Sequence, residues 1–142
     1  MALSKSSIAK LSGVHPDLVK VLKKASEISE TPFVVVEGAR TLARQKELLK
    51  AGATKILNSR HITGHAADIV PLLDGKIRWD WSLYLRLAVA VRAAAQSLNI
   101  PIRWGGTWDI INGTKGPFTT AMLSKTFPDG PHFELPRNKY KT

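Results

Sequence analysis

Apolar residues recur at helical spacing in three stretches, which we therefore predict to be helices. The first, 15–29, has Pro16 in its first turn, where proline is favoured because its missing amide hydrogen would have no partner there. The second covers 42–50. The third and longest, 81–98, follows Asp80 as a capping residue, and its many alanines predict close packing against a sheet.

Short apolar runs bounded by turn residues predict strands. Phe33-Val34-Val35-Val36 is a β-branched run of this kind, and 66–72 is a second that ends near the hairpin turn Asp74-Gly75. Two shorter strands are predicted at 101–104 and 132–135. The remaining segments are predicted to be loops at 53–58 and 109–127, the latter with one helical turn, and a frayed tail at 136–142.

Length and composition narrow the class of protein. A chain of 142 residues can form one domain that buries roughly two thirds of its unfolded surface. The absence of cysteine excludes thiolate metal sites, redox motifs and disulfide scaffolds. No apolar run approaches the about 18 residues of a transmembrane helix, and the polar residues 1–11 lack the apolar core of a signal peptide. We therefore expect synthesis in the cytoplasm, with any target outside the membrane reached by another route.

The formal net charge of +10 indicates an anionic partner, which could be a nucleic acid, a membrane surface or a cell-wall polymer. The basic residues are spread along the whole chain. They form no tight basic tract, and no aromatic platform of the RNA-binding type accompanies them. Charge alone therefore leaves the partner open.

Three of the four histidines fall in two short segments, 59–68 and 129–134, together with three acidic residues. A catalytic zinc site needs three nitrogen or oxygen ligands and one open position for water. The candidate ligands are His61, Asp68 and His132, with Asp129 or Glu134 left over as a base. We therefore take a zinc hydrolase as the working hypothesis.

Asp68 is the strongest candidate ligand, because a carboxylate inside an apolar run is costly unless it is paired or bound to metal. His61 and His65 are four residues apart, as in helical zinc proteases, but Ile62 stands where such a motif needs glutamate. We therefore expect His65 to support the site from outside the ligand set, or simply to pack. His15 is expected to cap a helix or lie on the surface.

Three ordered patterns resemble the VanY-like zinc D-alanyl-D-alanine peptidases, and most of all the phage endolysins that are L-alanyl-D-glutamate endopeptidases. The patterns are Ser59-x-His61-x-x-Gly64-x-Ala66-x-Asp68, Arg103-Trp104-Gly105-Gly106-x-Trp108 and Asp129-x-Pro131-His132-Phe133. Residues 11–18 and the element Glu37-Gly38-x-Arg40-Thr41 are also similar to endolysins. The likeness covers essentially the whole chain, so we expect a single catalytic domain, 1–142, without a separate wall-binding domain.

The resemblance implies an α+β fold, in which helices pack on a small antiparallel sheet, shared with the Hedgehog zinc domain. It implies one zinc ion and particular roles for the residues around it. The implied ligands are His61, Asp68 and His132, with Asp129 as general base, Arg40 polarising the substrate carbonyl, and Ser59 contacting the peptide. Glu134 is kept as a supporting partner of the ligands or, second to Asp129, as the base.

The function implied is that of a phage endolysin that cuts the L-alanyl-D-glutamate bond of bacterial peptidoglycan. The basic surface would hold a monomeric enzyme on the anionic envelope. Made in the host cytoplasm, it would reach the wall after the membrane is permeabilised. The nearest alternative is a D-alanyl-D-alanine carboxypeptidase, and a further one is a non-catalytic zinc module. A nucleic-acid-binding domain would leave the histidine and carboxylate cluster unexplained.

Overall fold

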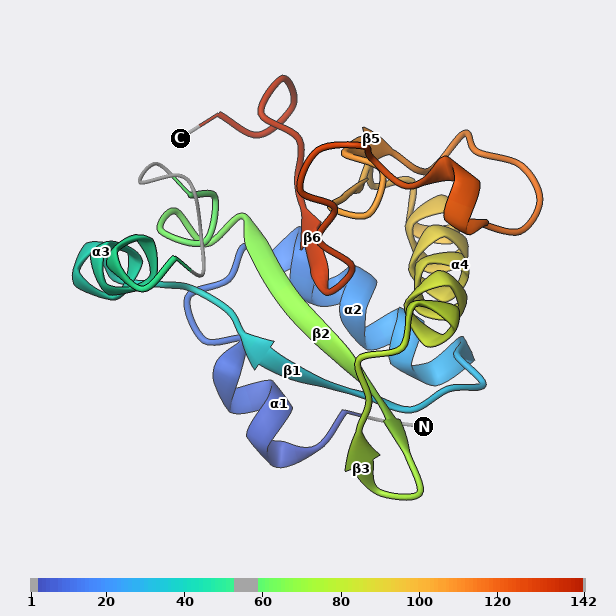
Figure 1. Cartoon of the computed structure of the whole chain (residues 1–142), viewed down its shortest axis with the longest axis horizontal. Helices are drawn as coiled ribbons and strands as arrows, with labels where there is room; N and C mark the ends of the chain where they lie inside the picture. Colours follow the sequence, from blue (N-terminus) through green and yellow to red (C-terminus); the bar gives the residue numbers. More distant parts are fainter. Residues whose placement is uncertain (1–2, 53–58, 142) are drawn as a thin grey trace.

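The computed structural model describes residues 3–52 and 59–141, so the loop predicted at 53–58 lies outside the described residues. Figure 1 shows helices gathered around one twisted sheet. The helices are α1 (Lys5–Lys10), α2 (Pro16–Ile28), α3 (Leu42–Lys50), α4 (Trp81–Leu98) and the short 3-10 turn η1 (Thr120–Met122). The strands are β1 (Phe33–Glu37), β2 (Ala66–Leu73), β3 (Lys76–Ile77), β4 (Arg103–Trp104), β5 (Asp109–Ile110) and β6 (His132–Glu134).

The sheet is antiparallel, with strand order β1-β2-β6-β4-β5. The short strand β3 forms a hairpin with the end of β2 and lies outside this order. This arrangement confirms the α+β class. The last strand of the chain, β6, therefore lies in the middle of the sheet beside β2 (Figure 1). That placement brings the two histidine-bearing segments of the sequence together.

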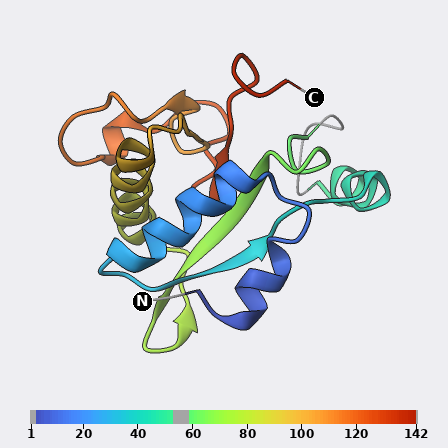
Figure 2. The same ribbon diagram turned by 180° about the vertical axis from the view of Figure 1, so that it is seen from behind.

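Two long helices cover one face of the sheet and leave the other face for the site. Figure 2 shows α2 lying across the back of the sheet, beside α4. The alanine-rich α4 packs against α2 as well as β2, which extends the packing predicted from its composition. Sheet residues that face these helices are fully buried, namely Ala67, Ile69, Trp104 and Phe133. Because neighbouring residues in a strand point to opposite faces, Asp68 and His132 point away from this core.

Both ends of the chain are held against the rest of the molecule, although no helix was predicted at the first end and the second was expected to fray. Residues 5–10 form α1, whose Ser7 hydroxyl accepts the amide of Val35 at 3.0 Å and so covers the outer edge of β1. The tail expected to fray is held by Tyr140, whose hydroxyl donates to Asp17 at 2.7 Å and whose carbonyl accepts from Arg60 at 2.8 Å. A contact made by one aromatic residue leaves no periodic pattern in the sequence. The prediction that the tail frays is therefore wrong.

Smaller corrections concern strand ends and caps. The strands predicted at 101–104 and 132–135 are shorter by one or two residues. His15 caps α2 by accepting the amide of Asp17, as predicted. Asp80 holds the capping position of α4 without making a capping hydrogen bond, because its carboxylate pairs with Arg78 at 2.6 Å.

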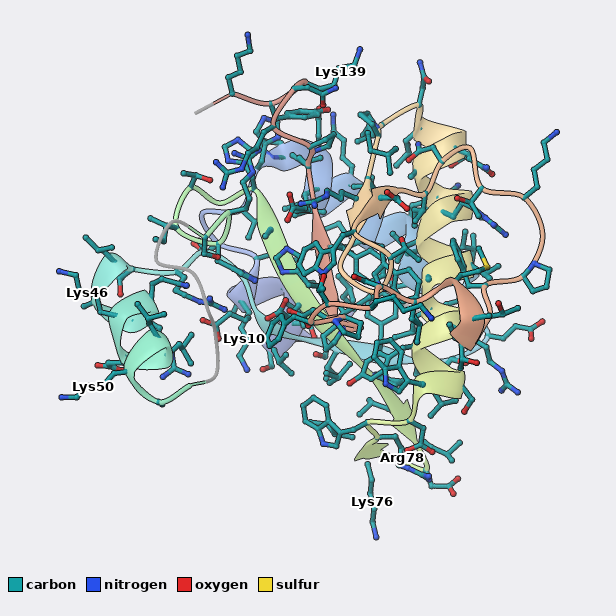
Figure 3. The ribbon with its side chains drawn as sticks, turned by 45° about the horizontal axis from the view of Figure 1, so that its top comes forward. Lys10, Lys46, Lys50, Lys76, Arg78 and Lys139 are labelled. Atoms are coloured by element: carbon teal, nitrogen blue, oxygen red, sulfur yellow. The ribbon has the colours of Figure 1, made fainter. Side chains whose placement is uncertain are left out.

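The basic side chains are distributed around the molecule. Figure 3 shows Lys46 and Lys50 extending from α3 on one side of the molecule, Lys76 from the β3 hairpin on a second side and Lys139 from the tail on a third. The spread predicted from the sequence is thus also a spread in space. None of the described helices has the length and apolar character needed to cross a membrane.

Candidate active site

The site is a row of residues that crosses the sheet on the face opposite the helices. Asp68 and His132 are direct partners in the β2–β6 ladder, so their side chains stand next to each other. A bulge in β1 between Val35 and Glu37 places Glu37 opposite Asp68 on the other side. Gly105 follows on the far side of His132, where its amide donates to the His132 carbonyl at 2.8 Å.

The three predicted ligands meet at one point. Nε2 of His61 is 3.2 Å from Oδ1 of Asp68, and Nδ1 of His132 is 3.3 Å from the same oxygen. The candidate ligand atoms of the three residues all lie within 4.8 Å of one another. Two imidazole nitrogens and a carboxylate oxygen at such separations are the donor set of a catalytic zinc centre.

Each histidine is oriented by a second hydrogen bond. Nδ1 of His61 lies 2.9 Å from the carbonyl oxygen of Gly38. A carbonyl only accepts, so Nδ1 carries the hydrogen and Nε2 is left to bind a metal. Nε2 of His132 lies 2.8 Å from Oε1 of Glu134, which directs Nδ1 toward Asp68. Such outer partners fix the ring orientation of metal-binding histidines, and the residues therefore fit a zinc ion.

The electrostatics of the cluster favour a bound cation. Burial opposes ionisation of Asp68, but His61 and His132 outweigh it and hold the pKa of Asp68 well below its usual range. Burial also opposes the charged form of His132 and so lowers its pKa. The hydrogen bonds of His132 to Asp68 and Glu134 outweigh this effect and raise its pKa to about 10. Without a metal, His132 is therefore protonated at neutral pH, and its positive charge balances the Asp68 carboxylate.

Asp129 is fixed by the turn that leads into β6. Its amide donates to the Gly105 carbonyl at 2.9 Å, and its own carbonyl accepts the amide of His132 at 3.2 Å. A Cβ atom at Gly105 would overlap the Asp129 carbonyl and lie 3.0 Å from the Cβ atoms of Asp129 and His132, so the turn requires glycine.

The two candidate bases differ in what already binds them. Burial and the neighbouring Asp68 raise the pKa of Asp129. No hydrogen-bond partner within 3–52 and 59–141 contacts the Asp129 carboxylate. Glu134 is engaged through Oε1 by His132 and through Oε2 by Arg103 at 3.4 Å, and these contacts outweigh burial and lower its pKa. The geometry therefore leaves Asp129, rather than Glu134, available to accept a proton.

Arg40 stands beside the metal cluster and is nearly buried, with 8% of its side chain exposed. Its Nε donates to Glu37 at 2.9 Å and its Nη1 to Gln45 at 2.6 Å. Nη2 lies 3.8 Å from Oδ2 of Asp68, so the guanidinium is held with one edge toward the site. Ser59 is buried, and its hydroxyl accepts the amide of His61 at 3.2 Å.

The predicted site residue His65 lies outside the metal cluster. Its Nδ1 is 2.7 Å from the Thr63 hydroxyl, and its ring lies 5.6 Å from that of His15, centre to centre. In the structure His65 therefore contacts Thr63 and His15. Sequence reasoning missed Arg60, a buried side chain that donates to the Leu135 carbonyl and to the tail. Its position between the motif residues Ser59 and His61 was the available signal.

A cavity of about 630 Å³ opens over the cluster. This volume lies within the about 300–1,000 Å³ that binding sites for small molecules span. Its walls include Asp129 and Arg40 beside the three ligands, and Arg103, Trp108 and Phe127 on the side of β4 and the following loop.

Comparisons with known proteins agree with this geometry. The phage L-alanyl-D-glutamate peptidase family matches residues 1–136. The L-alanyl-D-glutamate peptidase of Escherichia phage T5 is 33% identical over 135 aligned residues, and the match covers 92% of this chain and 95% of that protein. The L-Ala D-Glu endopeptidase ChiX of Serratia marcescens, whose crystal structure is known, is 42% identical in sequence. It superposes with a TM-score of 0.83 over 100% of this chain and 95% of that one.

Sequence, fold and site thus agree, and the resemblance inferred from the three sequence patterns is confirmed. The relatives match nearly the whole of both chains, so the likeness is not confined to the motifs. The chain belongs to the phage L-alanyl-D-glutamate peptidase family, and it is a peptidase whose class of substrate is bacterial peptidoglycan.

Proposed function

We propose that the chain is a zinc-dependent endopeptidase that cuts the L-alanyl-D-glutamate bond of the peptidoglycan stem peptide and so lyses the cell wall. The observation that carries the proposal is the convergence of His61, Asp68 and His132 beneath a cavity that also holds the Asp129 carboxylate. Family membership supports the choice of bond.

In this proposal His61 would hold zinc through Nε2, Asp68 through a carboxylate oxygen and His132 through Nδ1. When bound, zinc lowers the pKa of a water ligand to about 7 and polarises a carbonyl oxygen. Asp129 accepts the proton of the attacking water and returns it to the leaving amine of D-glutamate.

The surrounding residues prepare the site for this proton transfer. Arg40 supplies a fixed positive charge beside Asp68, and this charge would stabilise the negative charge that develops on the carbonyl oxygen of the substrate. Arg40 needs no rearrangement, because Glu37 and Gln45 already hold it. Glu134 keeps the His132 ring in place. Ser59 supports the backbone of His61 and lines the cavity, from which it can contact the peptide.

The basic surface suggests how the enzyme finds its substrate. Bacterial envelopes are anionic, so a chain of net charge +10 would be concentrated on them without a binding module. We propose a monomeric single catalytic domain, 1–142, made in the host cytoplasm and acting on the wall after the membrane is permeabilised.

A D-alanyl-D-alanine carboxypeptidase would use the same metal site, and the bond that is cut separates the two functions. Purified peptidoglycan should be digested and its soluble products identified by mass spectrometry. We expect new amino groups on D-glutamate, falling turbidity and no new reducing ends, because cutting this bond detaches the stem peptide from intact glycan. Free D-alanine as the main product, with constant turbidity, would assign the chain to the carboxypeptidases.

A further inference from the structure

We propose that Arg103 is the specificity residue of the site, which binds the α-carboxylate of the D-glutamate whose nitrogen is released. The inference rests on the proposed bond. In the stem peptide the chain continues through the γ-carboxyl of D-glutamate, so its α-carboxylate remains as a charged group. That carboxylate is attached to the same carbon as the scissile nitrogen, and it must therefore lie within a few ångströms of the reacting carbonyl.

Arg103 is held as a rigid platform at the cavity wall. It lies directly opposite Glu134 in the β4–β6 ladder, on the same face as the site. Its Cζ is 4.9 Å from the centre of the Trp108 ring, and its Nε donates to the Trp108 carbonyl at 2.9 Å. A stacked guanidinium with one nitrogen already bonded loses little conformational freedom on binding an anion.

This platform is coupled to the metal cluster on two sides. The Trp108 ring beneath it lies 5.3 Å from the ring of His132, centre to centre. Nη1 of Arg103 is 3.4 Å from Oε2 of Glu134, whose other oxygen contacts His132. Arg103 is thus one side chain away from a predicted metal ligand, and it lines the same cavity as the three ligands.

The guanidinium has binding capacity left. Its contact with Glu134 is long, and Nη2 has no hydrogen-bond partner in the described part of the chain. The side chain is 39% exposed while it lines the cavity. The planar fork of arginine binds a carboxylate through two parallel hydrogen bonds, which an uncharged amide cannot reproduce.

Four other arginines line the cavity, namely Arg40, Arg44, Arg60 and Arg137, and each already has an interaction partner, which for Arg44 is Glu47 at 3.6 Å. Arg40 uses Nε and Nη1 for Glu37 and Gln45, and its remaining edge faces Asp68. Arg60 is buried and donates to the carbonyls of Leu135 and Tyr140. Arg103 combines exposure to the cavity, a fixed orientation and an uncommitted nitrogen.

The test compares two soluble stem peptides that differ only at this group, one with D-glutamate and one with D-isoglutamine, whose α-carboxylate is an amide. We expect wild-type enzyme to prefer the carboxylate peptide. Arg103→Gln should lower kcat/KM for that peptide by about 10- to 100-fold, the usual range for a charge-assisted hydrogen bond. It should leave kcat/KM for the amidated peptide within about threefold of the wild-type value.

Arg86→Gln serves as the matched control, because Arg86 is exposed on α4, whose other side packs in the core behind the sheet. Bound zinc, measured for each variant, should equal that of the wild type. An equal loss on both peptides would mean that Arg103 only supports Trp108 and Glu134, and would overturn the subsite. Wild-type enzyme that cuts both peptides equally would overturn the subsite alone. Enzyme that cuts neither would overturn the proposed bond and the subsite with it.

Discussion

Replacing Glu134 with glutamine tests the division of labour between the two carboxylates of the site. Glutamine keeps the shape of the side chain and can still accept from Nε2 of His132, now 2.8 Å from Oε1 of Glu134. What the variant removes is the negative charge. A hydrogen bond to a charged group contributes about 1.5–3 kcal/mol and a neutral one about 0.5–1.5 kcal/mol.

The difference, about 1–1.5 kcal/mol, corresponds to roughly a tenfold weaker affinity for zinc. The contact of Glu134 with Arg103 adds little, because at 3.4 Å and with the arginine 39% exposed it is weak and screened by solvent. A tenfold change agrees with the 10- to 100-fold range of outer partners of metal ligands. Competition with a fluorescent zinc chelator would measure it.

Turnover at saturating zinc separates support from catalysis. Glu134→Gln should then recover kcat to within about tenfold of wild type. Asp129→Asn should remain about 10² to 10⁴-fold slower with its zinc fully bound, the loss expected for a general base. The opposite result, with Glu134→Gln inactive at full zinc occupancy and Asp129→Asn near wild type, would make Glu134 the base and refute our reasoning.

Three further predictions follow from the site and the surface. Zinc uptake at pH 7 should release about one proton, because His132, with its pKa raised to about 10, must lose a proton to bind. Affinity should therefore rise with pH, and calorimetry in buffers of different ionisation enthalpy would detect the proton. Gly105→Ala should lower the free energy of unfolding by about 1–3 kcal/mol, because the added Cβ overlaps the Asp129 carbonyl. Gly113→Ala is the control and should cause no such loss in thermal unfolding, because its Cβ would meet nothing within 4 Å. Activity on whole walls should fall with added salt far more than activity on a soluble peptide, because screening acts within about 8–10 Å at physiological ionic strength; equal dependence would contradict envelope targeting.

The metal cluster could be predicted from the sequence because its signal is chemical and local. A carboxylate in the apolar run of β2 needs a partner, and two nearby motif histidines can provide one. Both Asp68 and His132 were predicted to lie in strands, and the structure makes them direct neighbours in the sheet.

The supporting contacts could not be predicted in the same way. The link from Arg60 to Tyr140 joins segments that are distant in sequence, and neither residue belongs to a periodic pattern. The bulge that turns Glu37 toward the site depends on pairing with β2, and the stacking of Arg103 on Trp108 depends on a tight turn. Helix α1 is only six residues long, too short for periodicity to indicate it, although Ser4 caps it.

The direct pairing of Asp68 with His132 couples metal binding to the folding of the sheet. A slip of one residue between β2 and β6 would turn His132 to the opposite face and separate the ligands, so only the native register can bind the ion. Strand β6 is three residues long and joins a partner from the other half of the chain, a contact that is costly to form early. A metal ion held by Asp68 and His132 would therefore stabilise the sheet only in its native register, and it would favour the native sheet over misaligned alternatives.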